Sequence, residues 1–222
     1  MKTLIALTAA SALATAGAQA VSPNFNTIDL GLSAGYQGGL SGGVSVHARN
    51  VIGAFGLRIG ADITKVNDAL NDSAAFGPTG TWGDYKNSAN ATESGRSTTI
   101  GVDATYELGD IAPGISTYAY AGPRYNMYSA TADFGSSGKT TYTTNQLGLG
   151  AGAVAGYAIG NGLTLTGDLG VDYYFPSSIN SNDGAGNTDT FARGEAGYAE
   201  ADALVNQPRT VLKAKLGIAY RF

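Results

Sequence analysis

The sequence contains no cysteine, one histidine and one tryptophan among 222 residues, and charged residues make up only 14% of it. The lack of cysteine excludes a disulfide-stapled fold, a thiol nucleophile and a zinc site built on thiolates. A single histidine excludes a metal site of clustered imidazoles. Thirteen Lys and Arg against 17 Asp and Glu give a net charge of −4, which excludes the basic surface that nucleic-acid binding requires. We therefore expect no nucleic-acid partner, no metal and no cofactor.

The first twenty residues have the organisation of a secretory signal peptide. Lys2 provides the positive start, residues 4–14 are largely apolar, and the AQA tripeptide at 18–20 matches a small-residue cleavage site. We therefore expect residues 1–20 to be removed on export and residues 21–222 to form a single domain.

After residue 20, no segment approaches the roughly 18 consecutive apolar residues of a transmembrane helix. The chain instead alternates between apolar residues and small or polar ones, as Phe55, Leu57 and Ile59 do against Gly56 and Arg58. This period of two predicts β-strands. Eight strands are predicted, at 27–36, 42–49, 55–65, 98–108, 115–128, 146–159, 163–174 and 209–222.

The connections between these strands differ in length. Apart from a short first link near 37–41, they alternate between short turns, at 50–54, 109–114 and 160–162, and long polar loops, at 67–95, 129–144 and 175–208. This layout is typical of an up-and-down antiparallel outer-membrane β-barrel with short periplasmic turns and long extracellular loops. Residues 175–208 leave room for a further hairpin, so ten strands is an alternative to eight, and residues 191–205 favour a short helix.

The two faces of the predicted strands differ in chemistry. One face is Leu, Ile, Val, Ala and aromatic, as lipid contact requires. The other carries charges among Gly, Ser and Thr, and an eight-stranded barrel has room inside only for side chains. Because an unpaired charge there would cost several kcal/mol, we predict an interior network of paired charges. Its members are Asp29, Arg49, Arg58, Asp62, Asp103, Glu107, Arg124, Asp168, Asp172, Lys213 and Lys215.

Aromatic residues on the apolar face gather at the strand ends, as in the girdles of membrane barrels. They are Phe55, Tyr106, Tyr157, Tyr220 and Phe222 at the short-turn end, and Tyr36, Tyr125 and Tyr173 at the loop end. The sequence does not determine which residues of 115–128 point inward, because tyrosine occurs on both faces of this strand.

These features resemble the small eight-stranded outer-membrane β-barrels, the group that includes the OmpA transmembrane domain, OmpX and opacity-type proteins. The last strand ends in Phe222, preceded at alternate positions by Tyr220, Ile218 and Leu216. In that family such a strand implies recognition by the barrel-assembly machinery of the outer membrane. We expect a monomer surrounded by outer-membrane lipid.

The sequence carries no catalytic set, and we expect the protein not to be an enzyme. The leading hypothesis is a structural or surface-interaction role, in which the extracellular loops meet an unidentified ligand or partner. One alternative is a narrow porin-like channel through the Gly-, Ser- and Thr-rich interior. A weaker alternative is a lipid-acting barrel enzyme that uses His47, which is predicted near the periplasmic turns rather than at the outer rim. The last alternative is a soluble secreted β-sandwich, which would be extracted from cells without detergent.

Overall fold

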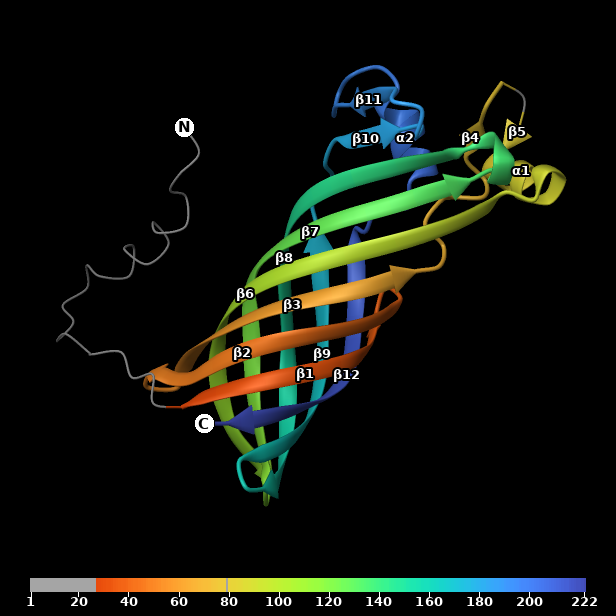
Figure 1. Ribbon diagram of the computed structural model, residues 1–222. Helices are drawn as coiled ribbons and strands as arrows, with labels where there is room; N and C mark the ends of the chain where they lie inside the picture. The colour runs from red at the N-terminus through yellow and green to blue at the C-terminus, as the bar shows by residue number, and fades with distance from the viewer. Residues whose placement is uncertain (1–26, 79) are drawn as a thin grey trace.

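The protein is a closed antiparallel β-barrel in the computed structural model, which describes residues 27–78 and 80–222. The predicted signal peptide at 1–20 lies outside the described residues. Eight of the described strands form the ring, which the pairing of β8 with β9 closes (Figure 1). They are β1 (Ile28–Gln37), β2 (Leu40–Ile52), β3 (Phe55–Val66), β6 (Thr92–Ala112), β7 (Ile115–Asp133), β8 (Lys139–Gly160), β9 (Leu163–Tyr174) and β12 (Thr210–Arg221). The predicted up-and-down eight-stranded barrel is confirmed.

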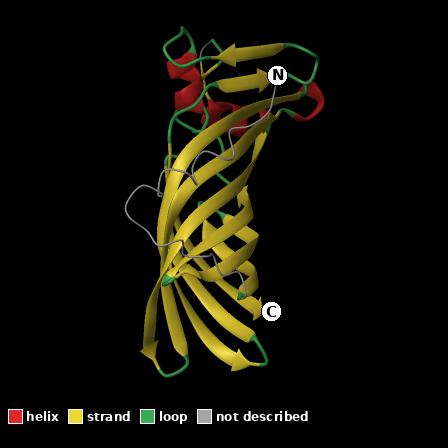
Figure 2. Ribbon diagram, turned by 90° about the vertical axis from the view of Figure 1, so that its left-hand side faces the viewer, coloured by secondary structure: helices red, strands yellow, loops and turns green. Residues whose placement is uncertain are grey.

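Tight turns join the strands at the end of the barrel that also holds the C-terminus. In the turn between β8 and β9, Asn161 and Gly162 have φ of 51° and 78°, as a type I′ hairpin requires. Figure 2 shows such turns at the lower end and both helices at the opposite end. Within the described residues, no helix has the length and apolar character needed to cross a membrane.

The facing of β7 follows from the position of Arg124. This side chain points into the barrel and is only 4% exposed, and strand residues two apart share a face. Tyr118 and Tyr120 therefore point inward as well, whereas Tyr125 faces outward and is 39% exposed. The inward position of Arg124 therefore shows which residues of this strand point inward, a question that its sequence left open.

The predicted long loop at 129–144 is wrong. β7 continues to Asp133 and β8 begins at Lys139, so only a turn with the short 3₁₀ helix η1 (Gly135–Ser137) joins them. β6 likewise begins at Thr92, six residues before the predicted start at 98. The added segments are rich in Thr and Ser, and Thr favours strands when neighbouring strands pair with it.

The polarity of the two faces inverts along these extended strands. On β7 the inward residues change from polar Asn126 to apolar Tyr128 and Ala130, while the outward residues change from Met127 to Ser129. An apolar outer face suits lipid, and a polar outer face suits water. The inversion is therefore expected where the wall of a membrane barrel passes from lipid into water.

Two further strands and a helix lie within the predicted loop at 175–208. β10 (Ile179–Asn182) and β11 (Thr188–Phe191) form a hairpin that pairs with β8 and extends the sheet beyond the ring. The hairpin anticipated there exists, but it does not add strands to the barrel. α2 (Tyr198–Leu204) lies inside the predicted helical stretch 191–205.

The loop between β3 and β6 holds β4 (Ala75–Phe76), β5 (Gly80–Thr81) and α1 (Trp82–Ala89). Thr81 and Asp84 form a capping box at the start of α1, which satisfies free backbone N–H groups. The Thr81 backbone N–H and hydroxyl both donate to Asp84 and lower the pKa of its carboxyl.

Ion pairs attach this loop to β6. The Lys86 Nζ lies 2.6 Å from Asp72 and 2.9 Å from Glu93, and these carboxylates raise the pKa of Lys86. Glu93 also accepts hydrogen bonds from the backbone N–H groups of Ala69 and Leu70. The Glu93 carboxylate, near the start of β6, thus binds the beginning of the loop at Ala69 and Leu70 and its later part at Lys86.

The main cluster of buried apolar side chains lies in this predicted extracellular part and not inside the ring. Trp82, Leu70 and Ile179 are fully buried there. The remaining members come from all the long connections and from the inner face of the extended sheet: Ala69, Ala74, Ala91, Tyr128, Ala130, Ala132, Tyr142, Ala201, Leu204 and Val205. The long connections therefore form a folded unit with its own core.

Leu70→Ala should loosen this folded unit and leave the barrel intact. Removing a fully buried leucine side chain costs about 2–5 kcal/mol, and Leu70 is packed in the extracellular cluster. Limited proteolysis of the refolded protein should cut the loops faster, while the heat-dependent gel mobility of the barrel stays as in the parent. Leu40→Ala, at a position 74% exposed, is the matched control, and equal proteolysis of both variants would contradict the assignment of the core.

Candidate functional site

The interior of the ring is filled by charged and polar side chains from every strand. The sheet is lined inside by glycine, serine and threonine, which leave space for long side chains from the opposite wall. A Cβ at Gly150 would meet Arg124 and Asp172, and one at Gly101 would also meet Arg124. The small residues of the wall therefore leave the space that the large charged side chains of the interior occupy.

The group nearest the tight turns is centred on Arg49. Its guanidinium donates two hydrogen bonds to Glu107, from Nε at 2.8 Å and from Nη2 at 2.6 Å. Asp29 lies 3.7 Å from the Arg49 Nη1 and accepts a 2.8 Å hydrogen bond from Arg221 Nε. Four strands, β1, β2, β6 and β12, are thus connected at this end.

His47 lies one layer further in and is 3% exposed. Its Nε2 lies 2.9 Å from the Thr105 hydroxyl, and its ring lies 4.5 Å from that of Tyr118. A cavity of about 50 Å³ beside it is lined in part by Asp29 and Arg58, room for a few water molecules. The structure gives His47 a hydrogen-bonded interior position that membrane lipid does not reach.

Asp168 holds the centre of the barrel. Arg58 Nη2 donates to it at 3.1 Å, the Tyr120 hydroxyl donates at 2.8 Å, and Lys213 Nζ lies 3.7 Å away. Arg58 and Lys213 also lie over the Tyr120 ring, 5.1 and 4.6 Å from its centroid, positions that favour cation–π attraction.

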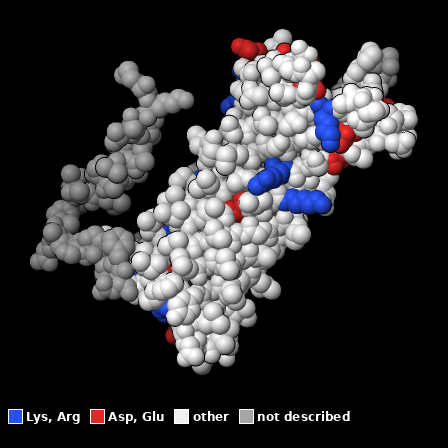
Figure 3. All heavy atoms as spheres, viewed as in Figure 1, with Lys and Arg blue, Asp and Glu red and all other residues white. Residues whose placement is uncertain are grey.

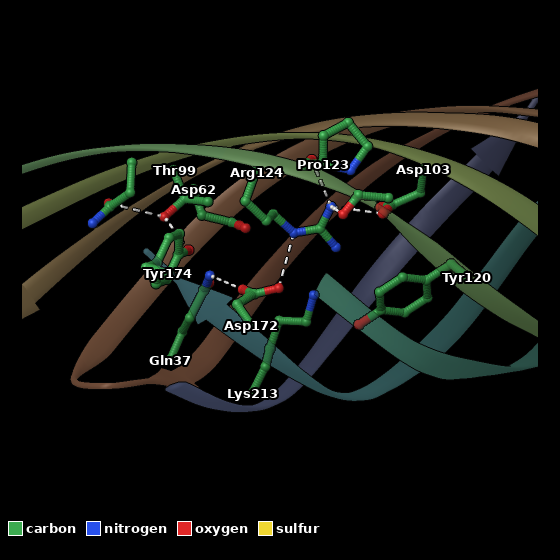
Figure 4. A network of polar contacts seen from close by, with 12 residues as sticks. Gln37, Asp62, Thr99, Asp103, Tyr120, Pro123, Arg124, Asp172, Tyr174 and Lys213 are labelled. Carbon is green, nitrogen blue, oxygen red and sulfur yellow. Dashed lines mark hydrogen bonds and ion pairs between the residues drawn. The ribbon is translucent and has the colours of Figure 1, made fainter. Parts of the chain in front are cut away.

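Arg124 holds the next layer together. Its Nη1 donates to Asp103 at 2.6 Å and its Nε donates to Asp172 at 2.9 Å (Figure 4). Gln37 donates to the second oxygen of Asp172 at 3.0 Å. Nearby, Lys215 Nζ lies 2.6 Å from Asp62. The structure thus brings each of the eleven residues of the predicted interior network into at least one ion pair.

Uncharged side chains close the interior toward the loops. Asn126 accepts from the Ser97 hydroxyl at 2.5 Å and donates to Gln146 at 3.2 Å. Gln146 in turn donates to the Pro208 carbonyl at 2.9 Å. A second cavity, of about 150 Å³, lies here beside Tyr174. The buried layers around Arg124 and Asp168 separate it from the cavity at His47.

Several interior residues were missed by the sequence prediction. Arg221 pairs with Asp29 at the rim, although it lies on the polar face of the last strand. Tyr120 was missed because the sequence did not determine which residues of its strand point inward. A charged Arg124 is expected inside the barrel, and Tyr120, four residues earlier, lies on the same face. Gln37 and Gln146 carry no charge and had no signal of their own.

Of three comparisons with known proteins, the one with solved structures gives matches. Neither the models of protein families nor the curated proteins contain a match. Among solved structures, a major outer membrane protein from Thermus thermophilus is 33% identical, with a TM-score of 0.80, covering 88% of this chain and 99% of that one. The N-terminal β-barrel domain of Pseudomonas aeruginosa OprF is 12% identical, with a TM-score of 0.47 over 89% and 98% of the chains. Neisserial surface protein A is 16% identical, with a TM-score of 0.41 over 88% and 95%.

Arg124→Ala should destabilise the barrel strongly, because it leaves Asp103 and Asp172 buried without their cation. Breaking a buried pair in this way costs about 3–5 kcal/mol. The measurement is the temperature at which the refolded barrel changes its gel mobility. Arg221→Ala is the control, since its side chain is 42% exposed and a pair of this kind is worth about 0–1 kcal/mol. Equal effects of the two variants would refute the central role of Arg124.

Proposed function

The chain belongs to the family of small eight-stranded outer-membrane β-barrels, and on this basis we propose that it serves a non-enzymatic structural and surface-interaction role through its extracellular part. The family fixes the location in the outer membrane. By the topology of such barrels, the tight turns face the periplasm and the long connections face the outside. The extended sheet and both helices are then the part of the protein that an external partner meets.

The observation that carries this proposal is the buried core of the extracellular part. Connections that only join strands need no order, and ordering a chain costs about 1–2 kcal/mol per residue in backbone entropy alone. Here the connections bury Trp82, Leu70 and Ile179 against the inner face of the extended sheet. A rigid surface of this kind presents a fixed arrangement of groups to a partner.

The filled interior argues against the alternative of a channel. Arg124, Asp172 and Lys213 are each no more than 6% exposed, and the two cavities near them lie on opposite sides of their layer. Moving an ion through this layer would require breaking pairs in which the desolvation of each charge is balanced by its partner.

The enzyme alternative has weak support from the site. Its proposed residue, His47, is buried against Thr105 and Tyr118, away from the membrane surface at which a lipid substrate would lie. The absence of catalysis remains part of the proposal.

The last strand supports the proposed route of assembly. Leu216, Ile218, Tyr220 and Phe222 all point outward and are 46–71% exposed. This apolar row is the pattern through which we expect the barrel-assembly machinery to recognise the chain. A monomer remains part of the proposal, and it is supported by the closed ring of described strands, which leaves no free strand edge in the ring for pairing with another copy.

The refolded protein should show no stepwise ion conductance in a planar bilayer. Tyr120→Ala removes the ring that fills the centre beside Arg58 and Lys213, and this variant should also stay silent, because the pairs of Arg124 with Asp103 and Asp172 remain. Heat-dependent gel mobility verifies that each sample is folded and inserted. Stable conductance steps from the parent protein would favour the channel instead.

Replacing residues 178–206 by a short Gly-Ser linker should abolish surface interactions but spare the barrel. Cells that make this variant should lose attachment to surfaces or to other cells, measured against cells that make equal amounts of the parent in the outer membrane. Replacing the tight turn at 113–114 by the same linker is the control for disturbance of the barrel. The proposed role fails if attachment and envelope integrity are both unchanged in the loop variant.

A further inference from the structure

Two cations on the outer wall of the barrel have no carboxylate partner within the chain as described. Of the 13 Lys and Arg, Lys2 lies outside the described residues, which leaves 12. Nine of these lie within 4.0 Å of a carboxylate oxygen. Lys65, Arg96 and Arg193 are the three described cations without such a pair, and the first two are direct neighbours.

Lys65 on β3 and Arg96 on β6 are register partners. Both are exposed and both point outward, since they share their faces with Ile63 and Ile100. Side chains in directly opposed positions have Cβ atoms about 4.5–5.5 Å apart, and like charges there destabilise the sheet. The fold therefore places two like charges in register at this position.

The neighbours in the same row do not relieve this repulsion. Leu40 on β2 lies opposite Lys65, and Ser129 on β7 lies opposite Arg96. Both are uncharged. An anion for the two cations must therefore come from the surroundings of the barrel.

The pair lies where the wall leaves the membrane. Ser129 is the first outward polar residue after Met127 on β7, at the point where the polarity of the faces inverts. Figure 3 shows the lower part of the barrel almost free of charged atoms in this view, with most of the charged atoms toward the loop end. A change from an apolar to a polar outer wall is expected at the polar headgroups of the outer leaflet.

An apolar groove of about 580 Å³ runs along the outer wall on the membrane side of the pair. It begins at Ala61 and Ile100, which are register partners four residues from Lys65 and Arg96 along each strand. At about 3.3 Å per residue, the separation is roughly 13 Å. The groove continues across β2 and β1 to β12, past Val44, Leu32 and Ile218.

We propose that Lys65 and Arg96 bind the phosphate of an anionic phospholipid in the outer leaflet, one without a cationic group in its headgroup to neutralise that phosphate, and that the groove receives an acyl chain of the same lipid. Arginine recognises phosphate through two parallel hydrogen bonds, and lysine adds a point charge. The bound phosphate offsets the repulsion between the two cations. This surface lies on the wall of the barrel and not on the folded loops, so its loss leaves the proposed surface role unaffected.

The test uses the full-length refolded protein and the variant Lys65→Gln/Arg96→Gln. Native mass spectrometry measures the binding of phosphatidylglycerol, of phosphatidylcholine with the same acyl chains, and of inorganic phosphate. We expect phosphatidylglycerol to bind the parent roughly ten-fold more tightly than the variant, the effect of losing a charge-assisted contact. Lys139→Gln, which removes an exposed lysine paired with Asp133, is the matched control and should bind as the parent does.

A second measurement separates binding from a structural role. In phosphatidylcholine bilayers the double variant should be at least as heat-stable as the parent, because the like-charge contact is gone. Adding phosphatidylglycerol should raise the unfolding temperature of the parent and not that of the variant. Equal affinity of parent and variant for phosphatidylglycerol would overturn the proposal, and so would inorganic phosphate binding as tightly as the lipid. Ala61→Phe, which narrows the groove, should weaken the binding of phosphatidylglycerol and leave the binding of inorganic phosphate unchanged.

Discussion

The narrow interior of an eight-stranded ring leaves almost no water to solvate a charge, so each buried ion must find its counterion on another strand. The pairs that result join residues far apart in the chain, such as Arg58 with Asp168 and Lys215 with Asp62. A slip of one residue in any strand would turn these ions toward lipid and bring apolar side chains inside. The charges therefore determine the register of the whole barrel, as an apolar core does in a soluble domain.

The apolar core of this protein lies elsewhere, as a consequence of the same constraint. Within the membrane, lipid contacts the apolar face and the ions occupy the inside. Beyond the membrane, water contacts the outer face, and Tyr128, Ala130 and Tyr142 turn their apolar side chains inward. Gln146 and Asn126 lie at the change between the two regimes and seal the ionic interior from the apolar cluster.

The sequence predicts the membrane part well because lipid on one side and a crowded interior on the other enforce strict alternation. The eight strands and the facing of charges such as Asp103 and Asp172 follow from it. The extracellular part was predicted poorly, because there the polar outer face of β7 and β8 carries Thr131 and Thr141, residues that resemble a loop when read alone. Only pairing with neighbouring strands distinguishes the two.

The rule that governs the interior also explains why Lys65 and Arg96 stand apart. Inside the barrel, each described cation has a carboxylate supplied by the chain, because nothing else can reach it. At the membrane border the surroundings contain anions of their own, and the chain can omit the carboxylate. A pair of like charges placed in register there is unfavourable for the isolated protein and favourable in a leaflet that carries phosphate. The interior of this barrel is thus adapted to its own ions, the wall within the membrane to lipid, and the wall beyond the membrane to water.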